Sequence, residues 1–311
     1  MTDLTSPIYN DETAARKHLE SIRWADGVVC PYCGCLRAAE IGGEKALGDG
    51  WYHCPDCRKK FTVRVGTVYE RSHIPLHKWV LATHLMSASK KGISAHQLHR
   101  MLGITYKSAW FMAMRIREAM APYTTEPMGG SGKTVEIDET YVGGREKNKH
   151  KRARKKENIG GTGKQIAFSL VERGGKVRSH HVANVKASTL RPILQEQIHA
   201  ESTVMSDEGG ARLAKEFEKH ATVNHSIGEY VRGEVTTNTV EGYFSILKRG
   251  ITGTYHHVSS AHLKRYLAEF DFRYNERIAL KVTDDERAVK AIKGAEGKRL
   301  TYRRTDANPN G

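Results

Sequence analysis

The sequence has no run of about 18 or more apolar residues, which excludes a membrane-spanning helix from the expected elements. Its first residues also lack the basic-then-apolar pattern of a secretory signal peptide. We therefore expect a cytoplasmic protein with no membrane partner. In that reducing compartment its five cysteines would not form disulfides.

Acidic residues are in the minority. The 311 residues include 35 Asp and Glu against 50 Lys and Arg, which gives a net charge of +15 at pH 7. This excess favours a polyanionic partner, most simply nucleic acid, with an anionic membrane surface as the competing candidate. The length is sufficient for about two or three small domains with cores of their own.

Although cysteine is scarce, four of the five cysteines form two CxxC pairs with 20 residues between them. Two such pairs can present four thiolates to Zn²⁺ tetrahedrally, which leaves no open position for a substrate. We interpret residues 25–66 as a zinc ribbon with a structural Zn²⁺ site. A redox dithiol is the alternative, but it needs only one pair. Cys35 is left over as a bystander thiol, and His53 is a weaker alternative ligand. The predicted ligands are Cys30, Cys33, Cys54 and Cys57.

Residues 72–121 are predicted to be helical, after an N-terminal helical arm over residues 1–24. Ser94 and Thr105 are predicted N-caps on either side of Gly103, and a helix, a glycine turn and a second helix are typical of a helix-turn-helix. The second helix would offer Lys107 and Arg115 to a DNA groove. An ordinary helical hairpin with solvated lysines is the alternative.

Three acidic residues stand at the predicted ends of strands or on a helix. Asp138 follows an alternating stretch in which Glu136 takes the same face, and Asp207 ends a second short apolar run. Glu241 lies off the apolar face of a predicted helix, and Lys248 follows it by seven residues. If folding gathers these carboxylates, they repel one another unless cations neutralise them, and their oxygens suit Mg²⁺ or Mn²⁺.

Neighbouring residues leave alternatives open. Each acid could instead be a solvated surface residue. Asn238 could share a helix face with Glu241, although a carboxylate offsets cation charge better than an amide does. Glu139 and Glu208 directly follow the two aspartates, and strand alternation predicts that they point away from the cluster.

A basic segment interrupts this half of the chain at residues 145–164. Eight Lys or Arg residues, including Lys151 and Arg152, fall within residues 145–156, and we expect them to bind phosphates without sequence preference. The glycines at 160–163 lack the order of a Walker loop. The predicted order of elements, strand, hairpin, helix, strand, helix, strand and helix, indicates a mixed α/β sheet with the acids at one edge.

Taken together, the chain resembles the DDE transposases of bacterial insertion sequences, in the group with a zinc ribbon and a helix-turn-helix ahead of an RNase H-like domain. The spacing from Asp207 to Glu241, and from Glu241 to Lys248, fits the pattern of that family. The segments that carry the resemblance are residues 30–34, 54–57, 61, 137–144, 206–208, 238–250, 253–256 and 272–275.

The resemblance implies an RNase H-like mixed sheet flanked by helices over residues 133–285, followed by a C-terminal tail over 286–311. It implies that Asp138, Asp207 and Glu241 hold two Mg²⁺ or Mn²⁺ ions for DNA cleavage by water and for joining of the freed 3′-hydroxyl to target DNA. Lys248 and Arg249 would steady the phosphate.

The resemblance also implies partners and a location. The partners would be transposon ends and target DNA, bound by a homodimer or higher oligomer at the bacterial nucleoid. Two rival functions remain. A zinc-ribbon transcription regulator would leave the three acids without a role. An RNase H-like nuclease would cut DNA without joining it.

Overall fold

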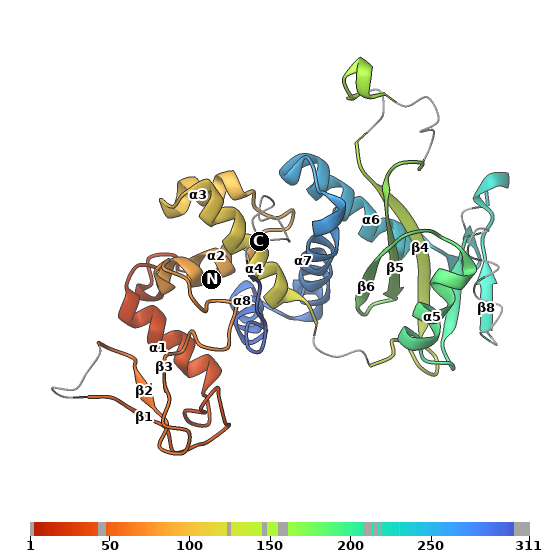
Figure 1. Cartoon of the computed structure of the whole chain (residues 1–311). Coiled ribbons are helices and arrows are strands. Elements are labelled where there is room, and N and C mark those ends of the chain that lie inside the picture. The colour runs from red at the N-terminus through yellow and green to blue at the C-terminus, as the bar shows by residue number, and fades with distance from the viewer. Residues whose placement is uncertain are drawn as a thin grey trace, which may run out of the picture. The chain divides into compact units, whose positions relative to one another are not determined.

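The computed structural model describes residues 3–42, 48–122, 126–144, 148–154, 161–207, 219–229 and 231–301, together with Gly210, Leu213 and Phe217. The chain divides into two compact units. In Figure 1 the colour runs from red at the N-terminus to blue at the C-terminus. The first unit combines Met1–Ala121 with Lys281–Gly311, and the second comprises Pro122–Leu280. Among the residues that the structure describes, every helix is too short or too polar to span a lipid bilayer.

The first unit begins with a helix and a small antiparallel sheet. The side chain of Asp11 accepts the N–H of Ala14 and so caps helix α1 (Glu12–Arg23). Strands β1 (Ala39–Glu40), β2 (Tyr52–His53) and β3 (Lys60–Phe61) pair in that order. The ring of Trp24, just after α1, packs edge-on against Tyr52 and Phe61. These buried aromatics give the sheet a core that is too small to hold it alone.

Three helices follow: α2 (Leu76–Ala88), α3 (Ala95–Leu102) and α4 (Tyr106–Met120). The side chains of Ser94 and Thr105 accept the N–H groups of Gln97 and Ser108, so both predicted N-caps are confirmed. Gly103 ends α3 with φ of 59°, a left-handed conformation that glycine adopts without strain. A helix, a glycine turn and a second helix are therefore present at the predicted residues.

Helix α8 (Asp284–Lys293) completes the first unit. Thr283 and Glu286 form a capping box that starts it, and the guanidinium of Arg287 donates to the carbonyl of Ser87 in α2 at 2.8 Å. The domain boundary predicted from the sequence, at residue 285, would divide these residues between the catalytic domain and the C-terminal tail. The structure instead makes them part of the N-terminal unit. Residues 302–311 of the predicted tail lie outside the described residues.

The second unit is built on a mixed five-stranded sheet flanked by helices, as the predicted fold class requires. Its strand order is β6-β5-β4-β7-β8. Strands β4, β5 and β6 form an antiparallel meander, while β7 and β8 run parallel to β4. The strands are β4 (Thr134–Val142), β5 (Gln165–Glu172), β6 (Val177–Val182), β7 (Thr203–Ser206) and β8 (Lys219–Thr222).

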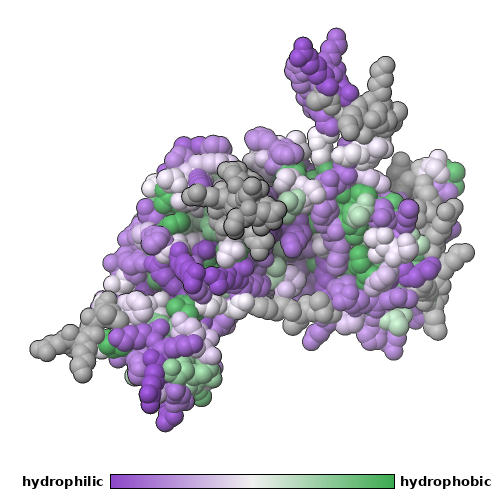
Figure 2. All heavy atoms as spheres, in the orientation of Figure 1, coloured by the Kyte–Doolittle hydropathy of each residue, from purple (hydrophilic) through white to green (hydrophobic). Residues whose placement is uncertain are grey.

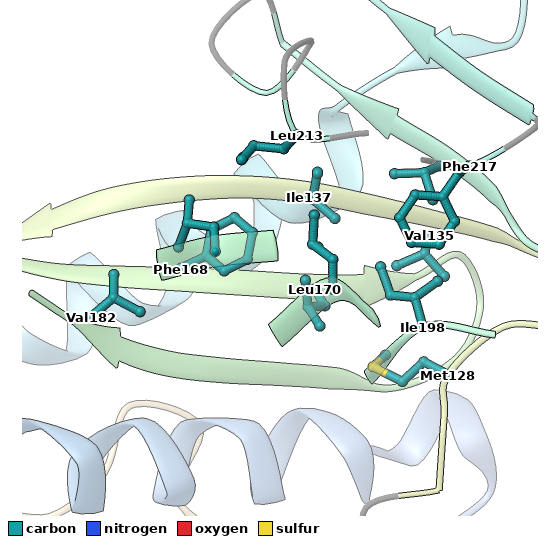
Figure 3. Packing of buried hydrophobic residues seen from close by; sticks show 12 residues of the cluster. Met128, Val135, Ile137, Phe168, Leu170, Val182, Ile198, Leu213 and Phe217 are labelled. Atoms are coloured by element: carbon teal, nitrogen blue, oxygen red, sulfur yellow. The ribbon is translucent and has the colours of Figure 1, made fainter. Parts of the chain in front are cut away.

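One face of this sheet carries the apolar core. Alternation along β4 and β5 directs Val135, Ile137, Phe168 and Leu170 to this face, where Figure 3 shows them packed together. Helix α5 (Ala187–Gln197) covers them with its buried leucines. Removal of these side chains from water is the main force that holds the face together.

The opposite face carries α6 (Asn238–Gly250) and α7 (Leu263–Asn275), with a short hairpin of β9 (Val231–Arg232) and β10 (Val235–Thr236) just before α6. Helix α7 is attached to the edge strand β6. The side-chain amide of Asn275 donates to the carbonyl of Val177 at 2.9 Å and accepts its N–H at 2.6 Å. This amide forms hydrogen bonds with backbone groups that would otherwise have no strand to pair with at the edge of the sheet.

A buried aspartate, Asp271, also links α7 to β6 and α6. Its carboxylate accepts the N–H and the hydroxyl of Ser179, both at 2.7 Å, and the hydroxyl of Tyr243. Burial raises the pKa of Asp271 from its ordinary 3.8 to about 6, although these hydrogen bonds lower it.

We expect this shift to make the protein less stable as the pH rises from about 4 to about 6. In that window the unfolded chain releases the Asp271 proton while the folded chain keeps it, so rising pH favours unfolding by up to about 3 kcal/mol. Asp271→Asn should remove this part of the pH dependence. Urea unfolding of both proteins across the window measures it. Identical slopes for the two proteins would contradict the prediction.

Candidate active site and zinc-binding cluster

The four predicted zinc ligands lie together. Their sulfur atoms are all within 4.8 Å of one another, and the pairs Cys30–Cys57 and Cys33–Cys54 are each 3.6 Å apart. Tetrahedral Zn–S bonds of about 2.3 Å place sulfur atoms about 3.8 Å apart, so the four thiols fit a structural Zn²⁺. Cys35 is not part of this group, and its sulfur accepts the N–H of Arg37 at 3.3 Å.

The pairing of β4 with β7 brings two of the predicted carboxylates to the same level of the sheet. Glu136 pairs with Met205, and Asp138 and Asp207 each follow two residues further along their strands. Both are half-buried. Burial raises the pKa of Asp138 to about 7, and the negative charges of Asp207, Glu139 and Glu241 add to the effect. The charges of the other two predicted acids, Asp207 and Glu241, therefore act on Asp138.

Glu241 reaches this cluster from α6, one turn beyond Asn238. Its exposed carboxylate accepts the hydroxyl of Thr237 at 2.9 Å. In the part of the chain that the structure describes, only the four thiols have all their ligand atoms within 4.8 Å of one another, so the carboxylates are more widely spread.

Glu139 points away from Asp138, as expected, because it pairs with Phe168, whose side chain lies in the apolar core on the other face of the sheet. Burial raises the pKa of Glu139, and the charge of Asp207 adds to that increase. Asp207 lies just past the end of its strand, where charges from both faces of β4 act on it. Glu208 lies outside the described residues.

From the sequence, Glu136 is expected only to share a strand face with Asp138. In the structure its side chain is fully buried and forms an ion pair with Arg173 at 2.7 Å. Alternation alone marks Glu136 as a residue on the site face. Nothing in the sequence spacing predicts its contact with Arg173, which comes from the end of the neighbouring strand.

Basic residues proposed to contact DNA lie at three exposed places. Lys107 is on the first turn of α4, and Lys248 and Arg249 are on the last turn of α6. Lys151 and Arg152 are on the short 3₁₀ helix Lys151–Ala153, in the segment that projects from β4 and β5 in Figure 1 and is strongly hydrophilic in Figure 2. Residues 145–147 and 155–160 of the basic segment lie outside the described residues.

Arg115 is buried rather than exposed, so the expectation that it reaches a DNA groove is wrong. Its guanidinium is buried and donates to three backbone carbonyls, those of Val68, Glu70 and Leu300, at 2.9, 3.0 and 3.2 Å. A buried guanidinium needs such partners, and moving it to a phosphate would leave these carbonyls unsatisfied. Arg115 thus holds the interior of the first unit together.

Comparisons with known proteins give first the class and then the family. Residues 10–60 match the transposase zinc-ribbon domain, and residues 129–275 match the ISXO2-like transposase domain. The chain is also 32% identical, over 281 residues, to a Halobacterium salinarum protein described as an uncharacterized protein in transposable element ISH50. That alignment covers 84% of this chain and 90% of the relative. The class is that of zinc-ribbon transposases, and the chain belongs to the ISXO2-like transposase family.

Proposed function

We propose that this protein binds the terminal inverted repeats of an insertion sequence and catalyses both cleavage of the DNA and strand transfer into a target. The observation that carries the proposal is the strand pairing that sets Asp138 beside Asp207, with Glu241 supplied by α6. Family membership supports DNA as the substrate.

The donor set fits hard divalent cations, because it consists of carboxylates whose negative charges repel one another unless a cation neutralises them. Asp138, Asp207 and Glu241 would hold two Mg²⁺ or Mn²⁺ ions. When bound, such ions activate the attacking oxygen and stabilise the leaving oxygen of a phosphodiester. The carboxylates would hold the ions, and the exposed side chains of Lys248 and Arg249 would orient the DNA phosphate.

Recognition of DNA is assigned to the N-terminal unit. The zinc ribbon over residues 25–66 and the helical segment over 72–121 would bind the repeats, with Lys107 facing a groove. Lys151 and Arg152, on the basic insertion of the second unit, would add phosphate contacts without sequence preference. Because strand transfer joins two transposon ends to one target, we propose a homodimer or higher oligomer on DNA.

A strand-transfer assay tests the proposal, with precut terminal repeats, a target plasmid and Mg²⁺. Joined products that depend on Asp138 would support it. Cleavage of uncut ends without any joining would favour a nuclease instead. End binding without either reaction, at every Mg²⁺ and Mn²⁺ concentration, would favour a DNA-binding regulator.

The third carboxylate has its own prediction. Glu241→Gln should lower strand transfer at least about a hundredfold, because it removes a main electrostatic group from the site. Asn238→Ala should cost less, since a neutral amide offsets no cation charge. Both variants are compared on precut ends in Mg²⁺. If Asn238→Ala is inactive and Glu241→Gln active, Asn238 is the ligand and our assignment is wrong.

A further inference from the structure

Helix α6 begins in an unusual way. Its N-cap residue, Thr237, makes no side-chain bond to the helix backbone. The N–H groups of Thr239 and Val240, which an N-cap side chain normally satisfies, instead donate to Oε2 of Glu136 at 2.8 and 3.0 Å. The hydroxyl of Thr239 donates to Oε1 at 2.9 Å. A carboxylate from strand β4 therefore performs the capping that is usually local, and it joins the helix to the strand.

Arg173 completes this arrangement. Its Nε donates to Oε1 of Glu136 at 2.7 Å, and its terminal nitrogens donate to the carbonyls of Glu234 and Thr236 at 2.9 and 3.0 Å. Those carbonyls belong to the segment that leads into α6. One guanidinium therefore neutralises the buried carboxylate and fixes the approach to the helix at the same time.

The pair formed by Glu136 and Arg173 is called the clamp below. Its placement relative to the proposed metal ligands indicates its function. Glu136 and Asp138 are two residues apart on one face of β4, about 6.6 Å along the strand. On the helix, Val240 is bonded to Glu136 and directly precedes Glu241. The clamp therefore sets the position of the Glu241 backbone relative to Asp138.

We propose that Glu136 and Arg173 are positioning residues that hold the Glu241 carboxylate at the distance from Asp138 that divalent cations require. The proposal rests on the proposed function. Glu136 itself is a poor candidate for a ligand, because its oxygens are already occupied by Arg173 and by the start of α6. Its negative charge also complements the positive end of the helix dipole.

A purely structural role is the competing explanation, and it makes a different prediction. A buried ion pair that only holds the fold together would, when broken, lower the unfolding temperature without changing the affinity of the folded protein for cations. A positioning role changes that affinity, since the two carboxylates would no longer face the same ion.

The experiment measures Mn²⁺ binding to the folded full-length protein by electron paramagnetic resonance of the free ion, in the absence of DNA. We expect Glu136→Gln to weaken binding at least about tenfold. The Mg²⁺ concentration for half-maximal strand transfer should rise in parallel, and saturating Mn²⁺ should restore most of the rate. The exposed glutamate Glu196 on α5 provides the matched control, and Glu196→Gln should bind Mn²⁺ like the wild type.

A milder variant keeps the proposal testable if Glu136→Gln fails to fold. Thr239→Val preserves the size of the side chain and removes only one donor to Glu136, so it should weaken Mn²⁺ binding about threefold. Folded variants that bind Mn²⁺ as tightly as the wild type would overturn the positioning role alone. If the wild type itself shows no Mn²⁺ binding that Asp138→Asn removes, the proposed function fails, and the clamp's role fails with it.

Discussion

Replacing Asp138 or Asp207 with Asn is expected to reduce strand transfer at least about a thousandfold, the upper end of the range for loss of one main electrostatic group. An amide matches the shape of the carboxylate but offsets no cation charge. The charge of Asp207 acts on Asp138, so both carboxylates belong to one electrostatic cluster. The measurement is strand transfer of precut ends in Mg²⁺, with end binding followed in parallel by mobility shift.

End binding should remain nearly unchanged in both variants, because we assign DNA docking to the other unit. Asp271→Asn supplies a control within the same domain, since Asp271 is buried in its own hydrogen-bond network and does not belong to the proposed ligand set. If Asp138→Asn or Asp207→Asn retains near-wild-type strand transfer in Mg²⁺, that aspartate does not belong to the site.

Loss of zinc is the second change with a large expected effect. We expect one tightly bound zinc per chain, and Cys54→Ser should lose it together with the fold of residues 25–66. The reason is that the aromatic core around Trp24, Tyr52 and Phe61 is small, whereas structural zinc contributes an apparent binding free energy of about 10–16 kcal/mol in comparable small domains. Metal analysis, limited proteolysis of residues 25–66 and end binding measure the loss.

The fifth cysteine offers a matched control. Cys35→Ser should keep its zinc and its end binding, since the Cys35 sulfur lies outside the four-thiol group. Purified wild-type protein without zinc, in which residues 25–66 still resist proteolysis, would refute the assignment.

Features whose signals are local could be predicted from the sequence. The spacing of the CxxC pairs identified the zinc ligands, and the residue types at Ser94 and Thr105 identified two helix starts that the structure confirms. The mixed sheet followed from the order of apolar segments. Asp207 directly follows the end of β7, as the sequence pattern predicts. The strand end predicted at Asp138 is wrong, because β4 continues four residues further, to Val142.

Features that depend on distant partners could not be predicted. Arg287 contacts a carbonyl 200 residues away, so no periodicity places α8 in the N-terminal unit. Arginine is a residue type that often contacts DNA, and only the fold shows that the guanidinium of Arg115 donates hydrogen bonds to backbone carbonyls instead. The hydrogen bonds between Glu136 and the start of α6 join residues that are more than 100 positions apart in the sequence. In each case a polar group found its partner through tertiary packing.

The return of the chain to the N-terminal unit has a consequence for how the protein can be dissected. The second unit is inserted into the first unit, whose chain begins before it and ends after it. A fragment that stops at residue 121 lacks α8, and with it the Arg287 bond to the Ser87 carbonyl and the Leu300 carbonyl that Arg115 uses. The smallest piece that retains the whole first unit therefore joins residues 1–121 to 281–311 through a linker, with the second unit removed.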